Sequence, residues 1–76
     1  MTRDEFDQRL RTLIRRRPFQ PFAVILVTGE RIEVDVPEAV ALGGGAAGYL
    51  SPSGEAFLFD CRGVREIVEP APEAAS

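Results

Sequence analysis

Residues 22–36 read FAVILVTGERIEVDV, and this stretch decides the fold. Its first part, residues 22–27, is short, apolar and rich in β-branched side chains, which is typical of a buried strand. Gly29 supplies the positive φ that a tight hairpin turn requires. Residues 31–36 then alternate strictly between charged and apolar side chains, as in a strand with one face on a core and one face in water. The stretch therefore predicts a β-hairpin.

The segment before the hairpin predicts an amphipathic helix. Thr2 and Glu5 have the spacing of a capping box, in which two side chains satisfy backbone N–H groups reciprocally. Acidic residues gather in the first turn and arginines in the last turn, as the helix dipole favours. Pro18 ends the helix, because the residue before a proline is pushed out of the α region. Apolar side chains recur at helical spacing and form one stripe: Phe6, Leu10, Leu13 and Ile14.

The second half of the chain predicts three further strands and one flexible loop. Residues 43–48 contain four glycines and predict a loop that leads into a short strand at residues 49–50. Residues 55–60 and 64–69 read as strands separated by a tight turn. Together with the hairpin, they make five short strands after one helix.

This order predicts a mainly β chain with one N-terminal α-helix. Five short strands on so few residues fit a strongly bent, partly closed barrel capped by the helix. An open α+β sheet covered by the helix is the alternative. We expect residues 1–69 to form a single helix-plus-barrel domain and residues 70–76, which read PAPEAAS, to be a disordered tail.

Residues 10–29, LRTLIRRRPFQPFAVILVTG, resemble the opening of bacterial Sm-like proteins of the Hfq type: a helix ending in arginines, a proline, an apolar strand and a polar-Gly turn. The turn before residues 64–68 is similar to the step between the last two strands of that family. The Arg-Pro-Phe-x-Pro-Phe entry at residues 17–22 also resembles small uncharacterised bacterial proteins. The Sm-like resemblance implies a five-stranded SH3-like barrel that pairs its outer strands with neighbouring copies in a ring.

The same resemblance implies RNA binding. Arg15, Arg16 and Arg17 lie where that family has an arginine-rich rim that touches RNA. The Tyr-Lys-His stretch with which the family binds uridine-rich RNA falls at residues 60–62, which read Asp-Cys-Arg. The aromatic side chain, the lysine and the histidine are therefore absent from this position.

Composition argues against catalysis, a metal and a cofactor. The chain has no histidine and one cysteine, which excludes a disulfide framework and leaves few ligands for a metal. A general base is usually a histidine or a carboxylate with a raised pKa, and the acids here fall at capping positions, on an outward strand face or in the tail. Cys61 has no histidine to activate it. We expect a protein that is not an enzyme, with no catalytic, cofactor-binding or metal-binding residue.

Charge and hydropathy indicate where such a protein works. No apolar run approaches the roughly 20 residues that cross a bilayer, and the N-terminus has no signal-peptide pattern. We therefore expect a cytoplasmic protein that does not bind membranes. The net charge of −3 divides unevenly: residues 1–17 hold six arginines and three acids, whereas residues 18–76 hold three arginines and nine acids.

Two functions from different classes follow. A lone chain of this size buries a marginal core, and short strands leave open sheet edges. The leading hypothesis is an interaction or assembly module that self-associates through edge strands into a homo-oligomer. The alternative is weak RNA or DNA binding by an arginine patch, since clustered arginines release counterions from phosphates. The residues of that patch are Arg9, Arg11, Arg15, Arg16 and Arg17.

Overall fold

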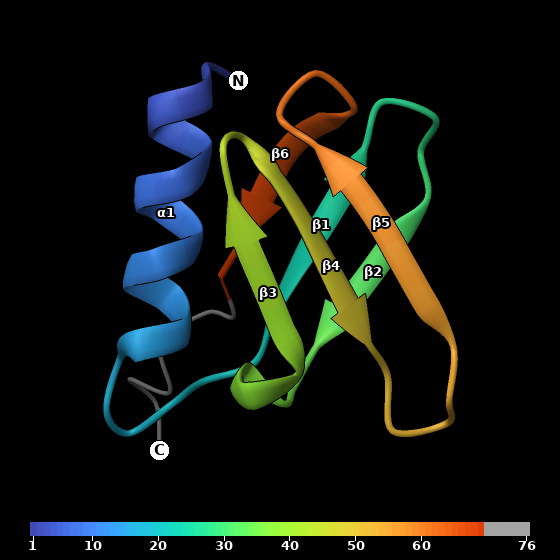
Figure 1. Cartoon of the computed structure of the whole chain (residues 1–76). Helices are drawn as coiled ribbons and strands as arrows, with labels where there is room; N and C mark the ends of the chain where they lie inside the picture. The colour runs from blue at the N-terminus through green and yellow to red at the C-terminus, as the bar shows by residue number, and fades with distance from the viewer. Residues whose placement is uncertain (70–76) are drawn as a thin grey trace, which may run out of the picture.

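The computed structural model describes residues 1–69 and contains one helix and six strands in that part of the chain. In chain order, these are α1 (Arg3–Arg15), β1 (Phe22–Leu26), β2 (Arg31–Val34), the 3-10 turn η1 (Pro37–Ala39), β3 (Val40–Gly43), β4 (Ala46–Leu50), β5 (Ala56–Asp60) and β6 (Val64–Val68). The strands form two antiparallel sheets, ordered β2-β1-β6 and β3-β4-β5. Figure 1 shows the two sheets one behind the other, with α1 along one side next to β3.

The predicted helix and its cap are confirmed. The N–H of Glu5 donates to Thr2 Oγ1 at 3.2 Å, and the N–H of Thr2 donates to Glu5 Oε1 at 3.2 Å. These hydrogen bonds lower the pKa of the Glu5 carboxyl, with the backbone N–H of Thr2 as the main cause. The helix ends at Arg15, and Arg16 is already extended, two residues before Pro18.

The predicted hairpin at residues 22–36 is also confirmed. Phe22 pairs with Val34 and Ile25 with Arg31, and Gly29 turns the chain with φ of +94°. Strand β1 lies at the centre of its sheet, between β2 and β6. The β1–β6 register shifts between Ile25 and Leu26, which is a bulge that turns side chains at irregular spacing toward the core.

The predicted partly closed, five-stranded SH3-like or Sm-like barrel is wrong, and so is the alternative of one open sheet. The six strands of residues 1–69 form two separate three-stranded sheets. The difference arises at residues 43–48, which form the last residue of β3, the turn and the first residues of β4 in a hairpin, instead of a flexible loop. Gly44 and Gly45 both have positive φ, +63° and +84°, and make a two-residue turn that joins β3 to β4. η1 separates β2 from β3, so the β1–β2 pairing does not continue into the second sheet.

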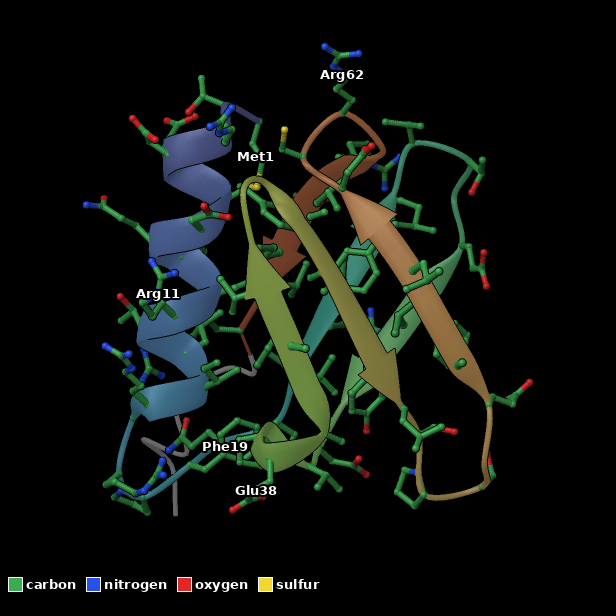
Figure 2. All side chains as sticks on the ribbon, in the orientation of Figure 1. Met1, Arg11, Phe19, Glu38 and Arg62 are labelled. Carbon is green, nitrogen blue, oxygen red and sulfur yellow. The ribbon has the colours of Figure 1, made fainter. Side chains whose placement is uncertain are left out.

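The hydrophobic core lies between the two sheets and α1. Phe6 of α1 meets Phe59 of β5 edge to face, with ring centroids 6.1 Å apart. Phe19 packs against the core below α1, beside η1 (Figure 2). The buried side chains of this core are Phe6, Leu10, Leu13, Phe22, Val24, Ile32, Val34, Ala47, Tyr49, Phe59, Val64 and Ile67.

A tyrosine connects the two sheets by hydrogen bonds. Tyr49 Oη of β4 donates to Asp35 Oδ1 at 2.8 Å, and the N–H of Asp35 donates to Tyr49 Oη at 3.4 Å. Burial raises the pKa of the Tyr49 phenol, and the hydrogen bond to the Asp35 carboxylate raises it further.

In residues 1–69, no helix is long and apolar enough to span a bilayer. The predicted disordered tail, residues 70–76, lies outside the residues that the structure describes.

Candidate functional site

The edges of the two sheets are the first candidate site. A three-stranded sheet has two edge strands, and the outward N–H and C=O groups of an edge strand have no partner within the sheet. The two sheets therefore present four edges, at β2, β6, β3 and β5. What covers each edge decides whether it is able to accept another strand.

Helix α1 covers the edges of β6 and β3. Arg9 Nη2 donates to the carbonyl oxygen of Ile67 in β6 at 3.4 Å. Asp7 Oδ1 accepts a hydrogen bond from the N–H of Gly45, at the β3–β4 turn, at 3.0 Å. The side chain of Arg3 also lies against Gly45, where a Cβ atom would be 2.7 Å from Arg3 Cγ. One helix thus occupies the space beside both strands.

The edge of β2 is charged. The N–H of Leu26 donates to the carbonyl oxygen of Glu30, and hydrogen-bonded pairs alternate along an antiparallel ladder. Arg31 and Glu33 therefore direct their backbone groups away from β1, and their exposed side chains form an ion pair with each other. Charged side chains on an edge strand disfavour pairing with another chain.

The hydrogen bonds at the two ends of β5 fix which of its residues pair with β4. At one end, the N–H of Ser51 donates to the carbonyl oxygen of Glu55 at 2.8 Å. At the other end, the N–H of Cys61 donates to the carbonyl oxygen of Gly45 at 2.8 Å. Because hydrogen-bonded pairs alternate along the ladder, every second residue between these ends directs its backbone groups to β4.

The intervening residues of β5 direct their N–H and C=O groups to the open side of the strand: these are Ala56, Leu58 and Asp60. Within residues 1–69, β5 is paired with β4 alone, and Figure 1 shows β5 on the side of its sheet away from α1. The carbonyl of Asp60 accepts a bond from the N–H of Gly63 at 3.0 Å. No lysine, arginine or proline lies in β5, whose sequence is AFLFD. In the described part of the chain, the edge at Ala56 and Leu58 therefore has no covering element and no charged side chain or proline.

The outer face of the sheet next to this edge is uncharged. The outward residues of β3, β4 and β5, apart from Asp60 at the end of β5, form what we call the uncharged face: Ala41, Gly43, Ala46, Gly48, Leu50, Ala56 and Leu58. Leu58 is 87% exposed and Leu50 is 55% exposed. The Leu58 side chain lies over Gly48, where a Cβ atom would be 3.1 Å from Leu58 Cδ2. Leu58, next to the open edge, is therefore the most exposed apolar side chain of this face.

An open depression of about 740 Å³ is lined by residues of β3, β4, β5 and the β1–β2 turn. Its lining includes Leu58 and Asp60 of β5 and Gly48 of β4, and it reaches Val27 and Thr28 in the β1–β2 turn. Val27 is itself 60% exposed. An extended apolar segment therefore has both backbone partners and apolar contacts along β5.

The predicted arginine patch is divided between two places. Arg9 and Arg16 each form an ion pair with Glu69, with N–O distances of 2.9 Å. The hydrogen bond from Arg16 is the main cause of the lowered pKa of the Glu69 carboxyl. Arg17 Nη1 donates to the backbone carbonyls of Arg16, at 2.9 Å, and of Ile14, at 3.2 Å. These three arginines therefore bind their own chain.

The other two arginines of the patch lie together on the helix surface. Arg11 and Arg15 are one turn apart and line a shallow depression of about 370 Å³ with Gln8 and Thr12. Within residues 1–69, neither guanidinium group forms an ion pair. Of the five arginines predicted to contact nucleic acid, the structure thus brings Arg11 and Arg15 together on the helix surface. The other three bind groups of their own chain.

The turn at residues 60–62 has a structural explanation. Asp60 Oδ1 accepts the N–H of Arg62 at 3.1 Å and the N–H of Gly63 at 2.9 Å, which stabilises the turn between β5 and β6. Figure 2 shows the Arg62 side chain pointing away from the molecule. Cys61 is half-buried, and its carbonyl accepts a hydrogen bond from the N-terminal amine of Met1 at 3.2 Å. Within residues 1–69, no group of three or more metal-ligating side chains gathers at one place.

The short strands of the sequence predict open sheet edges but do not indicate that β5 is the exposed one. The signal was the AFLFD segment itself, an aromatic and apolar strand without a basic residue or a proline. The sequence does not reveal the uncharged face, because three of its seven residues lie in the stretch 43–48, whose glycines predict a loop.

No protein-family model matches the chain, and no curated protein or solved structure matches it either. The Sm-like resemblance of residues 10–29 accordingly stays a prediction, and the function has to come from the geometry.

Proposed function

We propose that the protein is a non-enzymatic interaction and assembly module that self-associates by pairing β5 with a second copy of the chain. The observation that carries the proposal is the open edge of β5, where backbone groups of Ala56 and Leu58 have no partner within residues 1–69. Leu58 projects beside that edge with 87% of its surface exposed.

The contrast between the four edges supports this proposal. Folded monomers usually protect long apolar edges with charges, prolines or a covering helix. Among the described residues, α1 lies beside two edges and an Arg–Glu ion pair lies on the third, so the edge left without such protection is that of β5. An unprotected edge beside an uncharged face favours strand addition, in which backbone hydrogen bonds give affinity and apolar side chains give specificity.

A small core gives self-association a thermodynamic reason. Domains of this length bury only about 60% of the surface that the unfolded chain exposes. The protein has one cysteine, and oligomerisation stabilises a folded state that no disulfide holds. The chain carries a net charge of −3, and the uncharged face adds no like-charge repulsion to the contact between two copies.

The test is the mass in solution, measured by light scattering from roughly 5 to 500 µM, a range that detects weak association. We expect the mass of the wild-type protein to rise with concentration. Leu58→Lys places a charge at the centre of the open edge and should keep the protein at the mass of one chain. Leu50→Lys is the matched control, because Leu50 lies on the same face but on the central strand β4.

A wild-type mass that equals one chain at every concentration would refute the proposal. Equal behaviour of the Leu58 and Leu50 variants would show that the face associates without the edge, which also contradicts it.

A second candidate is weak binding of RNA or DNA by Arg11 and Arg15. The observation that favours it is the pair of adjacent guanidinium groups on α1 beside Gln8 and Thr12. Arg11→Glu/Arg15→Glu should abolish binding to a single-stranded oligonucleotide at low salt, and Arg62→Glu/Arg65→Glu is a control with the same charge change. Two phosphate contacts predict a slope of about −1.4 in log K against log salt. Equal loss in both double variants would indicate a general charge effect and remove this candidate.

A further inference from the structure

We infer that two copies join β5 to β5, antiparallel, about a two-fold axis at Leu58, and so form one continuous sheet of two β3-β4-β5 units. This inference rests on the proposed function and specifies the partner strand, the register and the symmetry. It differs from the head-to-tail ring that the Sm-like resemblance implies, in which one edge pairs with a different edge of the next copy.

The partner strand follows from what covers the other edges. A head-to-tail arrangement would pair β5 with β2, β3 or β6 of the neighbour. Helix α1 lies beside β3 and binds the β3–β4 turn through Asp7, and Arg9 of α1 donates to the backbone of β6. The edge of β2 has the charged side chains of Arg31 and Glu33. Since β5 is the remaining open edge, the most favourable partner of β5 is the same strand in a second copy. An interface between identical patches closes as a dimer and does not propagate.

The register follows from the positions of the open backbone groups. Strand β5 has five residues, and Leu58 is the central one. With the two-fold axis at Leu58, the N–H and C=O of Leu58 bond to Leu58 of the second copy. Ala56 then lies opposite Asp60 of the second copy, whose N–H faces the carbonyl of Ala56, whereas the carbonyl of Asp60 already accepts the N–H of Gly63 within its own chain.

Other registers are less favourable. The two neighbouring registers centre on Phe57 and on Phe59, and they leave Asp60 or Ala56 of each strand without a partner in β5. The registers beyond these centre on Asp60, which places two carboxylates directly opposite each other, or on Ala56, which leaves the Asp60 end of both strands unpaired. The register at Leu58 alone uses the full length of β5 without opposing charges.

The side chains agree with this register. Leu58 points outward on the uncharged face, so the two copies of Leu58 lie side by side, with Cβ atoms about 5 Å apart. The contact removes apolar surface of a side chain that is 87% exposed in one copy. The apolar surfaces beside β5 also become continuous across the two-fold axis.

Amide hydrogen exchange at two protein concentrations tests the inference. In the dimer, the N–H groups of Ala56, Leu58 and Asp60 should exchange at least tenfold more slowly at high than at low concentration. Those of Arg31 and Glu33 on β2 should not change. Protection that appears on β2 together with β5 would show head-to-tail pairing and overturn the inference while leaving the proposed function in place. A protein that remains a monomer removes both.

A disulfide trap tests the register. In a Cys61→Ser background, Leu58→Cys places two thiols opposite each other, with Cα atoms about 5.5 Å apart, a distance that a disulfide spans. We expect a covalent dimer under mild oxidation. Leu50→Cys is the control, because Leu50 is also exposed, at 55%, but lies on the central strand β4 away from the axis. Equal crosslinking of both variants, or none at Leu58 in a protein that associates, would overturn the register.

Discussion

Tyr49→Phe tests how the two sheets are held together. The substitution keeps the buried ring and removes the hydroxyl that bonds to Asp35 across the sheets. The bond of 2.8 Å to a carboxylate is of the charge-assisted kind, which contributes about 1.5–3 kcal/mol. Asp35 is exposed, so its carboxylate regains water in the variant, and the loss falls at the low end of that range. We expect the free energy of unfolding to fall by about 1.5 kcal/mol.

For a domain of this size, that loss corresponds to a decrease in Tm of about 6–12 °C. Urea unfolding at one fixed protein concentration measures it, because self-association would make stability depend on concentration. A double-mutant cycle with Asp35→Ala isolates the pair, and the double variant should be little less stable than Tyr49→Phe alone. A Tyr49→Phe variant as stable as the wild type would refute the role of this hydrogen bond.

The same pair predicts an alkaline limit. The pKa of Tyr49 is raised above its ordinary value of 10.0. The Tyr49 phenol therefore contributes fully to the free energy of unfolding below pH 10, and this contribution is lost as the pH rises through the raised pKa. Stability of the wild type should fall more steeply than that of Tyr49→Phe in this range.

Three further predictions concern the helix and its contacts. Phe6→Ala empties a fully buried position against Phe59 and should cost about 3–5 kcal/mol in urea unfolding; a cost below about 1 kcal/mol would mean that α1 is not packed on the sheets. Gly45→Ala, at φ +84° and against Arg3, should cost about 1–2 kcal/mol, whereas Gly43→Ala, with open space around it, should be near neutral; equal costs would contradict the turn. The pKa of the Glu69 carboxyl is lowered from 4.5, so its contribution to the free energy of unfolding is present above pH 4.5 and is lost as the pH falls through the lowered pKa. In Glu69→Gln, stability should therefore depend less on pH in this acidic range. An unchanged pH dependence would argue against the ion pairs of Glu69.

The elements that the sequence predicts correctly are those specified by adjacent residues. The capping box, the apolar stripe and Pro18 all lie within one helix, and each points to the same boundaries. The first hairpin is likewise specified locally, by Gly29 and by the alternation that follows it. Such elements can be predicted without tertiary information, because the residues that specify them are neighbours in the sequence.

The second sheet was harder to predict because a glycine-rich segment is compatible with two structures, a flexible loop and a tight turn. Gly44 and Gly45 read as flexible in composition, but with apolar residues on both sides they make the tight turn of a hairpin. Once residues 40–50 are a hairpin, β5 has a partner on one side only. The error in the loop therefore concealed both the number of strands and the outer face of the second sheet.

The division of the arginine patch depends on contacts between distant parts of the chain. Arg9 and Arg16 reach Glu69, more than fifty residues away in sequence. In the sequence, all five arginines lie close together in and just after the helix. The three-dimensional structure shows that Arg11 and Arg15 share one surface depression and that the other three arginines do not. The coverage of a sheet edge depends on tertiary structure in the same way.

The most direct measurement of strand pairing is an isotope-filtered NOE experiment on an equal mixture of labelled and unlabelled protein, at a concentration where light scattering shows association. In the register centred on Leu58, Phe57 lies opposite Phe59 of the other copy in a pair without hydrogen bonds, where Cα atoms approach to about 4.5 Å. We therefore expect an intermolecular NOE between the Hα atoms of Phe57 in one copy and Phe59 in the other. Intermolecular contacts from β2 or α1, with none from β5, would contradict it.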